Sequence, residues 1–350
     1  MLDTDRMRRI AEDLYVQKVT SVFGNDGISA LHTLLDFLIQ LYSRHDPGGR
    51  KAPLVVARHV HSRPTLGATP QHTVHNVSQI TDQIDQGCCV VLNANGSLDI
   101  YDISDVNPLD VSDSCIVYEF DQCAERFFIA RAIYGLINPS PVHASIFARP
   151  TFSSLTSALE DYKQKVAQNS SCLILQEAWN DEKRIFFKKK PEATMRKSLN
   201  QFLSHVLQDA EVRPEQNVDE THPVDVKVTW VYSSQRAIVE IKWLGDSIGD
   251  DGDIATSYRD ARALSGAQQL ADYLDSSATW GATVSTRGYL VVFDARRRAV
   301  NSSTASVARE DGLHYRFREI AYNPDFAAQR NDFAPPMRMF MHPIITESKI

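Results

Sequence analysis

The stretch "AIVEIKW" at 237–243 decides how the second half of this chain folds, because it has the pattern of a buried strand. Apolar and β-branched residues alternate along it, which is typical of strands. Side chains two residues apart in a strand point to the same face, so Glu240 and Lys242 are expected side by side. The stretch therefore predicts either a salt bridge on a solvent-exposed face or a site that uses an acid and a base together.

The segments around this stretch predict an α/β core with the order helix, strand, strand, strand, helix, strand. The expected elements are a helix at 192–208, a short strand at 210–218, strands at 223–232 and 237–244, a helix at 257–277 and a strand at 287–297. The turn "SSQR" at 233–236 is short enough to make the two strands beside it antiparallel neighbours. The Gly/Asp-rich segment 245–256 is expected to be a mobile loop that closes over a substrate.

The antiparallel pairing brings a second carboxylate towards Glu240 and Lys242. Asp225 lies on the strand before the turn and is expected close to both residues. Two carboxylates in one site repel each other unless a cation lies between them. Mg²⁺ prefers oxygen ligands and keeps several waters, so Asp225, Glu240 and the backbone carbonyl of Ile241 are the candidate ligands. Lys242 would then orient the attacking water or stabilise negative charge in the transition state.

These residues resemble the PD-(D/E)xK nuclease superfamily, which has the restriction-endonuclease-like fold. The matching positions are Asp225, in a loosened Pro-Asp motif "PVD", and Glu240-Ile241-Lys242 on the next strand. Gln269 and Tyr273, at i and i+4 on the following helix, fit the QxxxY pattern of RecB-like members. The resemblance covers residues 190–298, about a third of the chain.

The resemblance implies a fold, a reaction and a cofactor. The expected fold is a C-terminal restriction-endonuclease-like αβββαβ core, and the expected reaction is hydrolysis of DNA phosphodiester bonds with Mg²⁺ or Mn²⁺. Asp225, Glu240, Lys242, Gln269 and Tyr273 would be the catalytic set. Family members often add a helix glutamate as a metal ligand, and Glu192 is the candidate here, although an acid is also favoured at a helix N-terminus by the helix dipole.

Basic residues near these motifs are candidates for binding a phosphate backbone. They are Lys188, Lys189, Lys190, Arg196, Arg259 and Arg262. The alternative for each of them is an ordinary solvated surface charge. The net charge of −7 argues against indiscriminate binding of nucleic acid by bulk charge but leaves a local basic surface open.

The first half of the chain carries no catalytic motif. Residues 1–178 are expected to form a mixed α/β domain of recognition or regulation, and 179–350 the nuclease-like domain. Helices are expected within 6–43 and at 121–136, and a hairpin is expected around Asn95-Gly96. The five cysteines show no CxxC spacing, and no apolar run is long enough for a transmembrane helix, so we expect a cytoplasmic protein with reduced thiols and no membrane partner.

Three functions are open from the sequence. The first is a DNA nuclease, by analogy in bacterial defence or genome maintenance. The second is an RNA-cleaving enzyme with the same chemistry, and the third is an inactive nuclease-fold subunit that scaffolds a larger complex. Nucleases of this fold often pair their sites, so a homodimer, or a partner protein bound through the N-terminal domain, is also expected.

Overall fold

The chain forms two compact units, Met1–Ser153 and Ser154–Ile350, and each is mixed α/β, as the sequence predicts at the level of fold class. The computed structural model describes residues 4–47, 52–61, 69–80, 84, 86–121, 124–136, 145–149, 151–217, 223–278 and 284–345. The division lies at Ser153/Ser154 and not at the expected 178/179. The reason is Tyr162, whose buried ring packs on Phe202 and Phe293 and thereby joins the segment after residue 153 to the second unit.

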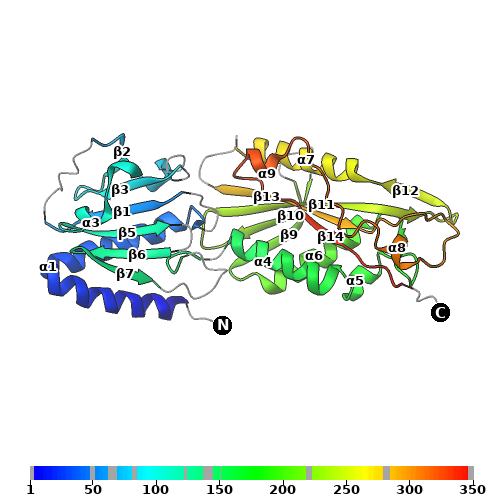
Figure 1. Ribbon diagram of the computed structural model, residues 1–350, viewed down its shortest axis with the longest axis horizontal. Coiled ribbons are helices and arrows are strands. Elements are labelled where there is room, and N and C mark those ends of the chain that lie inside the picture. The colour runs from blue at the N-terminus through cyan, green and yellow to red at the C-terminus, as the bar shows by residue number, and fades with distance from the viewer. Residues whose placement is uncertain are drawn as a thin grey trace. The chain divides into compact units, whose positions relative to one another are not determined.

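The first unit is a seven-stranded sheet with α1 (Thr4–Tyr42) packed against one face (Figure 1). This α1 consists of two helical segments that are separated by a break at Gly24, where φ is 63°. The strand order is β2-β4-β3-β1-β5-β6-β7, with β1 and β3 parallel and the other neighbours antiparallel. Its elements are α1 (Thr4–Tyr42), β1 (Leu54–His59), β2 (His72–Val74), β3 (Cys88–Leu92), β4 (Leu98–Asp102), α3 (Pro108–Val111), β5 (Cys115–Asp121), β6 (Ala124–Ile129) and β7 (Ala132–Leu136). The hairpin expected at Asn95-Gly96 is confirmed as the β3–β4 turn, where Gly96 has a φ of 82°.

The helix expected at 121–136 is wrong, because this segment is the β6–β7 hairpin. Ala130 and Arg131 have φ values of 47° and 66° and form its two-residue turn. Phe127 is fully buried against the rings of Tyr15 and Tyr118. Pairing with β5 and this aromatic packing outweigh the helix-favouring composition of the segment.

The second unit is another seven-stranded sheet, in which helices lie on both faces. The continuous order is β14-β13-β11-β10-β9, and β8 and β12 pair with the far end of β11. Its elements are α4 (Phe152–Tyr162), a π-helical turn (Lys163–Ala167), α5 (Leu173–Gln176), β8 (Phe187–Lys188), α6 (Glu192–Val206), β9 (Ala210–Asn217), β10 (Pro223–Trp230), β11 (Gln235–Ile248), β12 (Ile254–Tyr258), α7 (Asp260–Ala278), β13 (Ser285–Asp294), α8 (Arg309–Gly312), α9 (Phe326–Gln329) and β14 (Met337–Phe340). Figure 1 shows α7 on one side of the sheet and α4 with α6 on the other.

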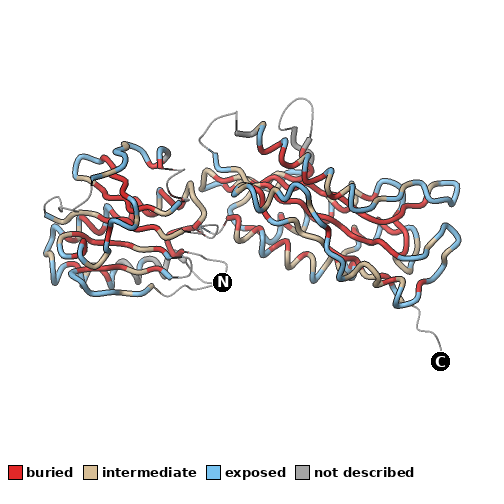
Figure 2. Tube along the Cα trace, turned by 45° about the horizontal axis from the view of Figure 1, so that its top comes forward, coloured by how far each residue is buried: buried red, intermediate tan, exposed pale blue. Residues whose placement is uncertain are grey.

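Strand β11 is the centre of this unit, and it is longer than the sequence predicts. Over Gln235–Leu244 it runs parallel to β13, and over Gly245–Ile248 it pairs with β12. The segment expected to be a mobile loop is therefore a β-hairpin with its turn at 249–253. Nearly all of β11 is buried, because helices cover both faces of the sheet (Figure 2).

No helix in the described part of either unit is long and apolar enough to cross a membrane.

Candidate active site

The candidate site lies where β10 separates from β11. The ladder between the two strands runs from Thr229↔Arg236 to Val226↔Val239 and ends there. Asp225 is the next residue of β10, and its Oδ2 accepts a hydrogen bond from the Ile241 backbone N–H at 2.8 Å. The Asp225 carboxylate thus takes the place of a backbone acceptor, and it lies at the level of Glu240, as the sequence predicts.

Glu240 and Lys242 lie side by side on β11, but not on a solvent-exposed face. Glu240 is 1 % exposed and Lys242 is 3 % exposed. The Lys242 ammonium donates to Glu240 Oε1. Glu240 Oε2 is buried and has no hydrogen-bond partner among the described residues. A salt bridge on the surface is therefore excluded. One buried oxygen of Glu240 accepts no hydrogen bond from the described residues, which is unusual for a buried polar atom.

Burial controls the acidity of Glu240. The pKa of this carboxyl is raised to about 7, mainly by desolvation and also by the nearby Asp225 carboxylate. The Lys242 ammonium acts in the opposite direction without cancelling the effect of burial. A cation at the unpartnered oxygen would lower this pKa and favour the ionised form.

This pKa predicts the pH dependence of folding in metal-free protein. A folded-state pKa near 7 against about 4.5 in the unfolded chain means that stability falls as pH rises through this window. Glu240→Gln removes the ionisation and with it this loss of stability. Between pH 5 and pH 8 the free energy of unfolding of the variant, relative to that of wild type, should therefore increase by on the order of 2–3 kcal/mol. Urea denaturation in EDTA at both pH values measures this gain, and parallel pH profiles for the two proteins would contradict it.

Gly266 on α7 makes room for the stem of Lys242. A Cβ built on Gly266 would lie 2.5 Å from Lys242 Cγ and 3.1 Å from both Lys242 Cε and Leu290 Cδ1. Real Cβ contacts are longer, so the glycine lets α7 lie directly over the lysine stem. The sequence alone does not reveal this role of Gly266, because the contact depends on how closely α7 approaches β11.

A Gly266→Ala exchange tests this packing. On an exposed helix position the exchange stabilises by about 1 kcal/mol. Here the added methyl overlaps Lys242, so we expect the free energy of unfolding to fall by about 1–3 kcal/mol in urea denaturation. Ser265→Ala, at the exposed neighbouring position of α7, is the control and should be neutral or slightly stabilising. Stabilisation of both variants alike would rule out the close contact.

Two arginines expected to bind phosphate form ion pairs with acids at the site. Arg196 on α6 donates from Nη1 to Asp225 Oδ1 at 2.9 Å. Arg262 on α7 donates from Nη2 to Glu192 Oε2 at 3.3 Å, and its guanidinium carbon lies 4.8 Å from the centre of the Tyr258 ring. Glu192 therefore lies near the site but is paired with an arginine.

The other basic residues predicted to bind phosphate lie near the C-terminal end of β11, beyond Lys242. Arg259 pairs with Asp246 at 2.9 Å, at the start of the β11–β12 hairpin. Lys188, Lys189 and Lys190 are exposed at β8. Lys188 pairs in register with Ile248, which is about 20 Å along β11 from Lys242. The structure thus places the lysine run away from the carboxylates and leaves it exposed.

Gln269 and Tyr273 share one face of α7, as the i, i+4 spacing predicts. Gln269 Nε2 donates to the Tyr273 hydroxyl at 2.6 Å. Tyr273 is buried in the core that α7 forms with the sheet. Both residues lie on α7 after Gly266, the residue that covers the Lys242 stem.

The residues of the site fit a hard divalent cation in donor chemistry. No group of three or more His, Cys, Asp or Glu side chains gathers as a metal site in the described residues. Mg²⁺, however, is usually held by one or two carboxylates and otherwise by waters. Asp225, the unpartnered oxygen of Glu240 and the Ile241 carbonyl provide such a set. Arg196 and Lys242 occupy the remaining carboxylate oxygens with positive charge.

A scan against protein-family models and searches of curated proteins and of solved structures found no match for this chain. The geometry of the site is therefore the basis for assigning a function.

Proposed function

We propose that the second unit is a metal-dependent phosphodiesterase of the PD-(D/E)xK type that hydrolyses DNA. The observation that carries the proposal is the buried group of Asp225, Glu240 and Lys242, in which one Glu240 oxygen has no hydrogen-bond partner among the residues that the structure describes. Burial of two carboxylates and an ammonium is costly, and a purely structural ion pair would satisfy its oxygens. Perturbed carboxyl groups at such places are typical of functional sites.

The element order of the second unit supports the restriction-endonuclease-like assignment. The unit contains, in the order of that core, helix α6, strands β9, β10 and β11, helix α7 and strand β13, with β12 inserted between β11 and α7. The carboxylates sit on its second and third strands, and the QxxxY pair on its second helix. Strand β14 is added at one edge of this core, and β8 and β12 are added at the far end of β11.

Each residue then has a role in the hydrolysis. Asp225, Glu240 and the Ile241 carbonyl would hold Mg²⁺ or Mn²⁺. A bound ion would supply positive charge at the scissile phosphate and acidify a water. The ammonium of Lys242 is bonded to Glu240, and its stem packs beneath Gly266. In this position Lys242 orients that water or stabilises the developing negative charge. Water adds to phosphorus as the bond to the 3′ oxygen breaks, which leaves a 5′-phosphate and a 3′-hydroxyl.

One observation favours the scaffold alternative. Asp225 and Glu192 each hold an arginine, and Lys242 holds Glu240, so the described side chains already neutralise most of the acidic charge of the site. A protein that had lost catalysis would keep such pairs for stability. The unpartnered oxygen of Glu240 is the feature that this alternative leaves unexplained.

The remaining parts of the proposal concern the setting of the enzyme. The first unit would recognise a substrate, a signal or a partner protein, and a homodimer would pair two sites. A cytoplasmic role in bacterial defence or genome maintenance rests on analogy with other nucleases of this type.

Cleavage assays separate the three functions. Wild type is incubated with supercoiled plasmid, single-stranded DNA and RNA of the same sequence, in Mg²⁺, Mn²⁺ or EDTA, beside Asp225→Asn. Metal-dependent cutting of DNA by wild type alone supports the proposal. Cutting of RNA alone supports the ribonuclease. No cutting of any substrate in either metal supports the scaffold.

A further inference from the structure

The segment 313–319, "LHYRFRE", presents an aromatic side chain to solvent beyond α8. Phe317 is 82 % exposed, one of the two most exposed large apolar residues of the second unit's described part, together with Leu173 at 79 %. A single exposed apolar side chain is common on protein surfaces. The surroundings of Phe317 distinguish it from Leu173.

Two arginines flank Phe317 in the sequence. The Arg316 guanidinium carbon lies 5.0 Å from the centre of the Phe317 ring. In the described part of the chain, no carboxylate lies within ion-pair distance of Arg316 or Arg318. Arg196, Arg259 and Arg262, by contrast, are each paired with an acid. This segment therefore carries positive charge that is not neutralised by an ion pair.

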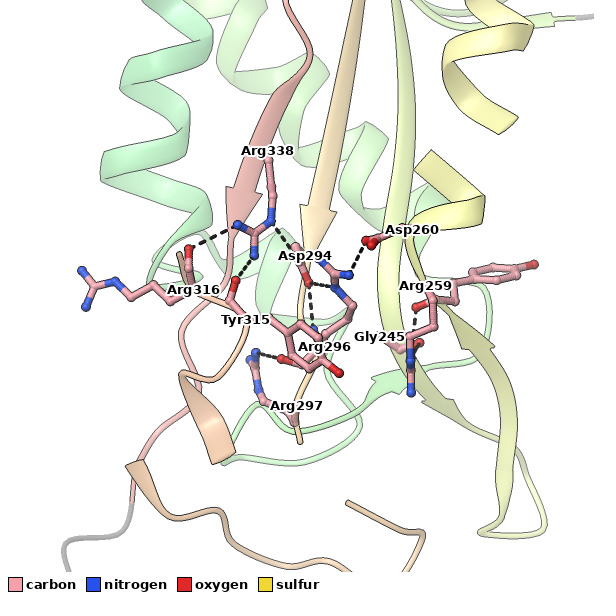
Figure 3. A network of polar contacts seen from close by, with 10 residues as sticks. Gly245, Arg259, Asp260, Asp294, Arg296, Arg297, Tyr315, Arg316 and Arg338 are labelled. Carbon is pink, nitrogen blue, oxygen red and sulfur yellow. Dashed lines mark hydrogen bonds and ion pairs between the residues drawn. The ribbon is translucent and has the colours of Figure 1, made fainter. Parts of the chain in front are cut away.

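A buried network fixes the backbone of the segment (Figure 3). Arg338 on β14 donates to the carbonyl of Arg316 at 3.2 Å and to the carbonyl of Tyr315. Arg338 is held by Asp294, which is fully buried at the end of β13, at 2.6 Å. The side chain of Arg316 extends away from this network. The segment thus presents its aromatic and basic side chains from a fixed backbone, which lowers the entropy cost of binding a ligand.

The same network joins the segment to the candidate active site. Tyr315 lies between two guanidinium groups, with Arg296 at 4.7 Å and Arg318 at 5.5 Å from its ring centre. Arg296 also holds Asp260, the first residue of α7. Asp294 on β13 is in register with Leu244 on β11. Leu244 is two residues, or about 7 Å, along β11 from Lys242. Arg338 thus connects the backbone of the segment to the end of β13 that lies beside this part of β11.

We propose that Phe317, Arg316 and Arg318 bind a single-stranded polynucleotide next to the site of hydrolysis. Aromatic rings on which bases stack, combined with cations that contact phosphates, are the general means of binding single strands without reading their sequence. The bases of an intact duplex are already stacked on one another and are not available to Phe317. The inference rests on the proposed function and adds to it that the substrate has an unpaired strand.

The test measures binding without cleavage. Fluorescence anisotropy with a labelled oligothymidylate, and with the same strand in a duplex, is recorded in EDTA. Phe317→Ala should weaken single-strand binding about tenfold and duplex binding by less than about twofold. Phe317→Tyr should bind like wild type, and Phe317→Leu like the alanine variant, because leucine keeps the apolar surface but has no ring. Arg318→Ala should lower the slope of log affinity against log salt by about 0.7.

Leu173→Ala is the matched control, since it removes an equally exposed apolar side chain from the same unit. Single-strand affinity that is equal in Phe317→Ala and Leu173→Ala would overturn the inference. So would a change of oligomeric state in Phe317→Ala, seen by sedimentation, with unchanged DNA binding, because Phe317 would then contact a second copy of the chain. Failure of the nuclease proposal appears separately, as absence of cleavage in Mg²⁺ by a protein that still binds single strands.

Discussion

Lys242→Met should abolish metal-dependent DNA cleavage, with kcat lowered by about 10³ or more. The substitution keeps an unbranched apolar stem beneath Gly266 and removes only the ammonium. Without that charge, nothing offsets the desolvation that raises the pKa of Glu240, so this carboxyl also becomes protonated at neutral pH. One change thus removes the group that acts on the phosphate and weakens a metal ligand.

The control for this variant is Lys227→Met, which makes the same exchange at a half-buried lysine of β10. It should keep cleavage close to that of wild type. If Lys242→Met fails to fold, the double variant Glu240→Gln/Lys242→Met removes both charges together and avoids an unpaired buried carboxylate. Full activity in either Lys242 variant would mean that the site has been assigned to the wrong residues.

Arg196→Gln should tighten Mg²⁺ binding by about tenfold or more, while it destabilises the metal-free protein by about 2–3 kcal/mol. The Arg196 guanidinium is bonded to Asp225 Oδ1 and competes with a cation for that carboxylate. Its removal frees the oxygen and leaves two buried carboxylates, Asp225 and Glu240, with one fewer counter-ion. Metal binding and stability therefore change in opposite directions, which a general loss of structure would not produce.

Calorimetric Mg²⁺ titration and urea denaturation, both on the same preparations, measure the two effects. Lys197→Gln is the control, because it removes the same charge from the next, exposed position of α6. Lys197→Gln should leave both the Mg²⁺ affinity and the free energy of unfolding close to those of wild type. Weaker metal binding in Arg196→Gln would show that Arg196 does not compete with the cation.

The placement of Asp225 beside Glu240 could be predicted because local rules determine it. A four-residue segment between two apolar strands enforces antiparallel pairing, and the period of two sets which residues share a face. The period of two also places Lys242 beside Glu240, and the i, i+4 spacing of a helix places Gln269 beside Tyr273. None of these predictions requires knowledge of distant parts of the chain.

What the sequence could not predict depends on contacts between distant segments. The pairing of Arg196 with Asp225 requires the position of α6 against the sheet, and the burial of Glu240 requires α7 above it. The β6–β7 hairpin was predicted as a helix, because its composition favours a helix and only pairing with β5 makes it a strand. The 245–256 hairpin was predicted as a loop for its glycines and aspartates, although β8 and β12 extend the sheet there.

The most direct test of the account is a calorimetric titration of Mn²⁺ into wild type and into Asp225→Asn/Glu240→Gln at pH 8, where the Glu240 carboxyl is ionised. The account predicts a saturable site in wild type, with release of a proton as pH is lowered towards the Glu240 pKa of about 7, and no such site in the double variant. Absence of binding in wild type, or equal binding in both proteins, would contradict the claim that these carboxylates form a metal site.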